Sequence, residues 1–295
     1  MSVHQSLVRF ANFPGYSGFK APAAGVHHVK GFISKGMASQ PRLLFVTDYG
    51  LGAVYIYSLP KLALMGTITG LSGPQGGCSG KKGNVWITNT NTKQIFEYSR
   101  AGTLVNTLTD SAGLPVGCAY DKKTGNLAVS NILSASYGAG NVVVYANATG
   151  SGTTLSNPAQ EEDFFPTYDT SGNLYVDGTS TTGSFILSEC ASGSSSCTTM
   201  SISGASPTFP GGLNWNKKTS SIVIGDQECS QGSCQYTGTV SGDTVTVTST
   251  TALLSSTGGT CDVDQAALGP DGKFIAGGCF SYPSAAARWA MPAGG

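Results

Sequence analysis

The stretch NVWITN at residues 84–89 decides the fold, because similar stretches recur along the chain. Each is an apolar run that ends in a small residue and then Asp, Asn or Gly. Together the copies are LLFVTD (43–48), NVWITN (84–89), NLAVSN (126–131), NLYVDG (173–178), SIVIGD (221–226) and KFIAGG (273–278). Their last residues, at 48, 89, 131, 178, 226 and 278, lie 41 to 52 residues apart. A strand-like repeat of about 40–50 residues is typical of β-propeller blades.

The same four parts surround each copy, which is itself expected to be the second strand, B. A Gly-rich apolar stretch such as PQGGCS (74–79) precedes it and suits an innermost strand A, where backbones approach closely. A turn such as KKGN (81–84) or KKTGN (122–126) joins the two. An alternating strand C and a polar, Thr-rich outer strand D follow, as in DTVTVTS (243–249). The sequence therefore predicts an all-β, six-bladed β-propeller of four-stranded antiparallel blades.

The two ends of the chain are expected to close this propeller. Residues 41–295 hold the repeats, and residues 1–40 form an N-terminal segment that contributes the closing strand or strands. The last unit ends at MPAGG, directly after strand C. The segment HHVKGFISKG (27–36) could supply the missing outer strand, the inner strand of the first blade, or both. Such pairing of the N- and C-terminal segments would remove open sheet edges.

The repeats resemble a known group of propellers. An apolar pair followed by Thr and Asp or Asn, a variable loop, and then V-x-V-Y, as in NVVVYA (141–146), is similar to the NHL and YVTN classes over residues 41–291. Members of these classes include lactonases, lyases, receptors and scaffolds. The resemblance therefore implies the architecture more than the chemistry.

Composition and cysteines bound the environment in which the protein works. Charged residues make up 11% of the chain, the formal net charge is zero, and no basic patch indicates nucleic acid. No apolar run is long enough for membrane insertion. Eight cysteines sort into local pairs, which predicts disulfides and a secreted, extracellular or periplasmic location, with buried free thiols as the alternative. The expected pairs are Cys78–Cys118, Cys190–Cys197, Cys229–Cys234 and Cys261–Cys279. We interpret the chain as the mature form of a secreted protein.

Candidate ligand-binding residues lie just after strand B and just before strand A, because the B–C and D–A connections share one side of a propeller. The acidic ones are Asp177, Asp226, Glu161, Glu162, Asp163, Asp262 and Asp264. Asp177 breaks the repeat, since the other copies carry Thr, Ser or Gly there. Such oxygens suit Ca²⁺, the candidate cofactor, or sugar hydroxyls. The alternatives are that recurring Asp and Asn side chains cap turns and that the acidic clusters are solvated loops. Tyr137 and Tyr282, in B–C loops, are candidate aromatic contacts.

Two functions remain open from the sequence. The first is a secreted binding or scaffold module that holds a carbohydrate, peptide or protein partner on the channel side. The alternative is a metal-assisted hydrolase or lyase, similar to lactonases. Gluconolactonase-type propellers hold a metal through one Glu, two Asn and one Asp, and the matching positions here are Gln75, Val116, Phe165 or Pro166, and Pro210. Only Gln75 offers a side-chain oxygen there, so the catalytic residues and any metal ligands stay unassigned.

Overall fold

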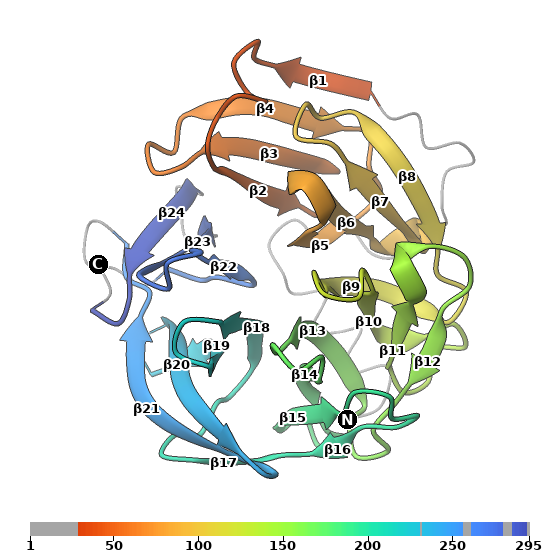
Figure 1. The fold of residues 1–295 in the computed structure, drawn as a ribbon, viewed down its shortest axis with the longest axis vertical. Coiled ribbons are helices and arrows are strands. Elements are labelled where there is room, and N and C mark those ends of the chain that lie inside the picture. The colour runs from red at the N-terminus through yellow and green to blue at the C-terminus, as the bar shows by residue number, and fades with distance from the viewer. Residues whose placement is uncertain (1–28, 231, 256–260, 280–284, 294–295) are drawn as a thin grey trace. The chain divides into compact units, whose positions relative to one another are not determined.

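The computed structural model describes residues 29–230, 232–255, 261–279 and 285–293, and these residues form an all-β, six-bladed β-propeller without an α-helix (Figure 1). The chain divides into two compact units, Met1–Thr154 and Leu155–Gly295. Each unit contributes three sheets.

The N-terminal unit holds the first three sheets, whose strand orders are β1-β4-β3-β2, β5-β6-β7-β8 and β12-β11-β10-β9. The strands are β1 (Val29–Ile33), β2 (Leu43–Asp48), β3 (Ala53–Ser58), β4 (Leu64–Thr69), β5 (Pro74–Ser79), β6 (Val85–Asn89), β7 (Gln94–Tyr98), β8 (Leu104–Thr109), β9 (Gly113–Tyr120), β10 (Leu127–Ser134), β11 (Asn141–Tyr145) and β12 (Thr153–Leu155). The pairings among β1 to β11 within these sheets are antiparallel.

The C-terminal unit holds the other three sheets, ordered β13-β14-β15-β16, β17-β21-β20-β19-β18 and β22-β23-β24. The strands are β13 (Glu162–Tyr168), β14 (Leu174–Thr179), β15 (Phe185–Cys190), β16 (Thr198–Thr199), β17 (Ser201–Ser203), β18 (Pro210–Asn216), β19 (Ser221–Cys229), β20 (Gly232–Ser241), β21 (Thr244–Ala252), β22 (Ala266–Leu268), β23 (Phe274–Cys279) and β24 (Ala285–Ala290). The fifth sheet gains a fifth strand because β17 pairs in parallel with β21.

Five of the six copies form second strands of their sheets, as predicted: β6, β10, β14, β19 and β23. The prediction is wrong for LLFVTD (43–48), because β2 is an edge strand of the first sheet and pairs with β3 alone. Every residue of β6 and of β14 is buried. Residues of the first and third sheets pack on the two faces of β6, which explains its continuous apolar run.

The core consists of clusters packed between successive sheets of one unit. In the N-terminal unit, Ile56 and Ile68 of the first sheet pack with Ile87 and Phe96 of the second. Trp86 belongs to the next cluster, with residues of β10 and β11. In the C-terminal unit, Tyr175 of β14 packs with residues of β18, β19 and β20, and its ring stacks on Trp215 at a centroid distance of 5.9 Å. Burial between blades therefore supplies the apolar stabilisation of each unit.

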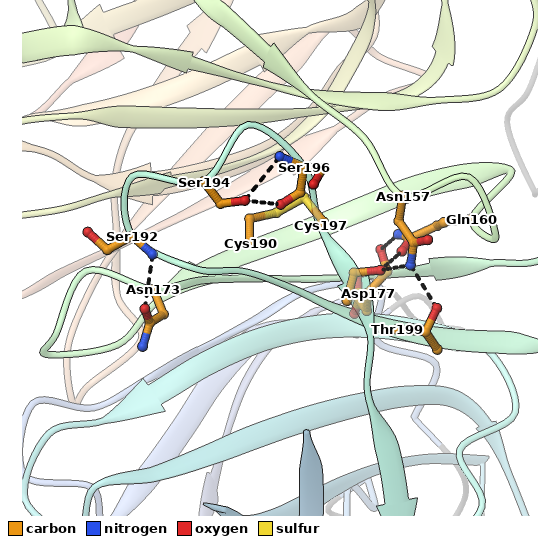
Figure 2. The surroundings of a disulfide bond; sticks show 11 residues. Asn157, Gln160, Asn173, Asp177, Cys190, Ser192, Ser194, Ser196, Cys197 and Thr199 are labelled. Atoms are coloured by element: carbon orange, nitrogen blue, oxygen red, sulfur yellow. Dashed lines mark hydrogen bonds between the residues drawn. A yellow bond between two sulfur atoms is a disulfide. The ribbon is translucent and has the colours of Figure 1, made fainter. Parts of the chain in front are cut away.

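All four predicted disulfides are present. Cys190–Cys197 links the end of β15 to the segment before β16 and is drawn in Figure 2. Cys78–Cys118 joins the inner strands β5 and β9, where the two Cα atoms lie 5.6 Å apart. Four disulfides indicate an oxidising, extracellular type of environment. None of the described residues belongs to a helix able to cross a bilayer.

The N-terminal segment lies elsewhere than predicted. Val29–Ile33 was expected as the outer strand of the last blade or the inner strand of the first, but it pairs with β4 as the outermost strand of the first sheet. The physical reason is that Ile33 packs, with Met37, on the apolar cluster that β3 and β4 form with β6 and β7. Closure of the propeller by the two chain ends stays a prediction.

Candidate functional site

Asp163 and Asp177 form a buried acidic pair between β13 and β14. Asp177 is fully buried and Asp163 is 3% exposed. One oxygen of Asp177, Oδ1, accepts a hydrogen bond of 2.7 Å from the backbone N–H of Phe165. Neither Oδ2 of Asp177 nor Oδ2 of Asp163 has a hydrogen-bond partner. The pair therefore places two unpaired carboxylate oxygens in the interior of the protein, where an unpaired charge is costly.

The electrostatics of this pair follow from burial and mutual repulsion. Burial raises the pKa of Asp163 well above its usual range. Burial also raises the pKa of Asp177 strongly, and the nearby Asp163 carboxylate raises it further, whereas the N–H groups of Phe165 and Gly212 favour the charged form. Both residues are acidic candidates from the sequence, and the structure brings them together.

A polar network supports Asp177 from the connection that precedes β13 (Figure 2). The Gln160 amide donates to the backbone carbonyl of Asp177 at 3.1 Å and accepts a hydrogen bond from the Ser188 hydroxyl. The Asn157 amide donates to Ser188 and to the Thr199 hydroxyl, both at 2.8 Å. Asn157 and Gln160 are not among the candidates predicted from the sequence, because neither lies in a repeated position.

The strand register explains why Asp177 is left with an unpaired oxygen. Asp177 lies opposite a bulge in β13, and Thr88 lies opposite the matching bulge between Pro74 and Gly77 in β5. The Thr88 hydroxyl accepts from the Gly76 N–H at 2.8 Å, and the same oxygen lies 3.2 Å from the Val116 carbonyl oxygen, to which it can donate. A carboxylate reproduces only the accepting half of this pattern. Asp177 therefore needs a proton, or another cation, to complete it.

The two neighbouring glutamates make different contacts. Glu162 is buried, and its Oε2 accepts a hydrogen bond of 2.5 Å from the Thr179 hydroxyl. Glu161 is partly exposed, and its backbone N–H donates to the Thr179 carbonyl at 2.7 Å. Of the run 161–163, only the Glu161 side chain is oriented with an appreciable part of its surface in solvent.

Asp226, the last residue of the repeat copy in the fifth sheet, is 1% exposed and accepts four hydrogen bonds. Three come from the backbone N–H groups of Thr208, Phe209 and Glu228 at 2.9 to 3.0 Å. The Tyr236 hydroxyl supplies the fourth at 3.3 Å. This carboxylate ties the end of β19 to the segment before β18, which is the turn-capping alternative considered from the sequence.

The last acidic candidates lie before β22. Asp262 is exposed, whereas Asp264 is only partly accessible to solvent. Burial and then the neighbouring Asp262 charge raise the pKa of Asp264 to about 7. In the described residues, no group of three or more His, Cys, Asp and Glu side chains is placed to hold a metal ion.

The aromatic candidates divide between described and undescribed parts of the chain. Tyr137 lies in the turn between β10 and β11 of the N-terminal unit, is 48% exposed, and has a left-handed backbone with φ of 62°. Tyr282 lies outside the described residues. Because Tyr137 and the acidic candidates belong to different units, we treat them as separate features.

Comparison with solved structures places the chain among β-propellers. A functionally unknown protein from Desulfotomaculum acetoxidans is 12% identical, with a TM-score of 0.54, over 80% of this chain and 72% of that chain. Virginiamycin B lyase from Staphylococcus aureus is also 12% identical, with a TM-score of 0.54, over 86% of this chain and 78% of that chain. Hydrazine synthase from Kuenenia stuttgartiensis is 9% identical, with a TM-score of 0.58, over 81% of this chain and 71% of that chain.

These likenesses show the fold alone, because each lies at low sequence identity. No protein-family model matches the chain, and no curated protein matches it in sequence. The resemblance to NHL and YVTN repeats stays a prediction. The fold is consistent with a binding or scaffold module.

Proposed function

We propose that this protein is a secreted binding module that holds a carbohydrate, peptide or protein partner at its B–C turns, with Tyr137 as an aromatic contact. The observation that carries the proposal is the conformation of Tyr137. A bulky residue at positive φ costs about 1–2 kcal/mol relative to Gly. Residues kept in such strained conformations are concentrated at functional sites. Tyr137 is nevertheless 48% exposed, so burial does not offset this cost.

The turn around Tyr137 is preorganised. Its N–H donates to the Ser134 carbonyl at 2.9 Å, and the Gly138 carbonyl accepts from the Ser134 N–H at 3.1 Å. Beneath the turn, the buried Asn131 amide donates to Asp110 at 3.1 Å and to Asn141 at 3.0 Å. A tyrosine on a fixed backbone provides a large contact area at the cost of ordering only two side-chain torsions on binding.

Replacing Tyr137 with Gly tests the proposal. The variant Y137G should gain about 1 kcal/mol in free energy of unfolding, because Gly adopts positive φ without strain. It should also lose binding to whichever member of a panel of neutral polysaccharides and casein peptides the wild-type protein retains. The matched control is K93G, since Lys93 has φ of 55° in the B–C turn of the preceding blade. K93G should gain similar stability and keep binding.

The outcomes separate the proposal from its alternatives. If the wild-type protein retains no member of the panel, or if Y137G binds as tightly as K93G, Tyr137 is not a binding residue. Unfolding in urea, followed by tryptophan fluorescence, gives the stability difference on the same samples.

The second candidate function is a metal-assisted hydrolase or lyase, and the buried pair Asp163 and Asp177 favours it. Two unpaired carboxylate oxygens are the kind of donors that Ca²⁺ takes, although Ca²⁺ needs six to eight oxygens in all. Elemental analysis of the purified protein, followed by a screen of lactone and ester substrates, tests this function. A stoichiometric divalent ion that is lost from the D163N/D177N variant, together with turnover of a lactone or ester, would favour the enzyme over the binding module.

A further inference from the structure

A basic pocket lies in the N-terminal unit, between the A–B turns of its second and third sheets. It has a volume of about 400 Å³, and its charged lining consists of Lys81, Lys82, Lys122 and Lys123, next to Tyr120 and Asn147. These turns are at the opposite ends of the strands from the B–C turns. The pocket is therefore distinct from the site proposed around Tyr137.

The sequence builds this pocket from two equivalent turns. KKGN (81–84) joins β5 to β6, and KKTGN (122–126) joins β9 to β10. The Cys78–Cys118 disulfide connects β5 and β9 only a few residues before the two lysine pairs. Gly125, with φ of 82°, allows the tight second turn. Lysines that are about 40 residues apart in the sequence are thus held on the rim of one cavity.

The balance of charge in the pocket favours anions. All four lysines are exposed. The nearest acids bond to neighbouring turn atoms: Asp121 accepts from the backbone N–H groups of Lys123 and Thr124 at 2.9 and 3.2 Å, and Glu97 accepts from the Asn84 amide at 2.8 Å. Four positive charges therefore outnumber these two negative ones in a chain with zero formal net charge. Such a concentration attracts a ligand that carries several negative charges.

We propose that this pocket binds an acidic polysaccharide through its sulfate or carboxylate groups. Lysine ammonium groups bind such anions as point charges, without the fixed geometry that arginine imposes. Tyr120, Thr124 and Asn147 line the same pocket and supply a ring, a hydroxyl and an amide for the sugar hydroxyls. The disulfides favour an extracellular ligand over an intracellular nucleic acid. The opening between two turns, rather than a closed cavity, suits a chain that continues on both sides.

Paired substitutions test the proposal on the full-length protein. K81Q/K82Q and K122Q/K123Q each remove two charges from the pocket. K217Q/K218Q is the matched control, because Lys217 and Lys218 are exposed in the equivalent turn between β18 and β19. Calorimetric titration uses a heparin oligosaccharide and oligogalacturonate as probes, with dextran and a single-stranded oligonucleotide of equal charge for comparison. Urea midpoints confirm that each variant is folded.

Each pocket variant should bind the acidic oligosaccharide about 30-fold more weakly than the wild-type protein, because it removes two lysines and each lysine contributes about fivefold to the affinity. The control should change affinity by less than threefold, and binding should weaken with added salt. The proposal is overturned if the wild-type protein binds neither acidic probe, if the pocket variants bind normally, or if the control loses as much. Equal or tighter binding of the oligonucleotide would also overturn it, in favour of a nucleic acid. Y137G should bind the acidic probes normally, so the two proposed sites can fail independently.

Discussion

Removing the Cys78–Cys118 disulfide should destabilise the protein more than removing any other disulfide. Its cysteines are 40 residues apart in sequence, against 5 for Cys229–Cys234. A cross-link restricts the unfolded chain in proportion to the logarithm of the loop it closes. The expected losses are therefore about 4 kcal/mol for the long loop and about 2 kcal/mol for the short one. Cys118 is also 2% exposed within the cluster around Trp86, so its replacement adds a small packing loss.

Equilibrium unfolding in urea measures this difference. C78A/C118A and C229A/C234A remove the same number of sulfur atoms, so the second variant serves as the control for loss of cysteine chemistry. Comparable slopes of free energy against urea are required before midpoints are converted to free energies. A loss for C78A/C118A equal to or smaller than that for C229A/C234A would refute the loop-entropy reasoning.

The other predictions concern the buried acids of β14 and β19. D177T should raise the free energy of unfolding near pH 8 by about 1–3 kcal/mol, because a hydroxyl completes the hydrogen bonds that Thr88 makes. The pKa of Asp177 in the folded protein is raised above its ordinary value of 3.8, so the stabilising effect of its protonated form is fully present below pH 3.8 and is lost as the pH rises. The free energies of unfolding of wild type and D177T should therefore converge near pH 4. Parallel curves of these free energies from urea unfolding at pH 4, 6 and 8 would contradict this. D226A should lose about 3 kcal/mol or more in free energy of unfolding, because the substitution leaves four buried donors, including the Tyr236 hydroxyl, without their acceptor. If thermal or urea unfolding shows that D226A loses less than about 1 kcal/mol in free energy of unfolding, these donors find other partners.

The sequence predicted the blades well because local patterns determine them. The strands Val85–Asn89 and Leu174–Thr179 are buried along their whole length, and turn residues such as Gly125 separate strands elsewhere in the repeats. The disulfide Cys78–Cys118 was also predictable, because equivalent positions in adjacent blades lie on neighbouring inner strands. The position of Val29–Ile33 was not predictable, since an apolar segment of this length can cover several sheet edges and only packing selects one.

The candidate sites were harder to predict because burial depends on contacts between distant segments. The pattern identified Asp163 and Asp177 but gave no sign that both would be enclosed with unpaired oxygens. It also treated the lysine pairs at 81–82 and 122–123 only as turn residues. Their repetition in consecutive blades was the available signal, because equivalent turns of adjacent blades are neighbours in space.

Residues that interrupt a repeat acquire their roles from the position they occupy. At the place opposite the inner-strand bulge, Thr88 both accepts and donates, whereas in the fifth sheet Gly225 is required because a Cβ would lie 1.9 Å from the Gly211 carbonyl oxygen. Asp177 occupies the same place with a group that can only accept when ionised. A threonine would satisfy this position at no electrostatic cost, whereas the carboxylate leaves its Oδ2 without a hydrogen-bond partner. Protonation of Asp177 supplies the donor that the ionised carboxylate lacks, and burial favours this neutral form by raising the pKa of the group.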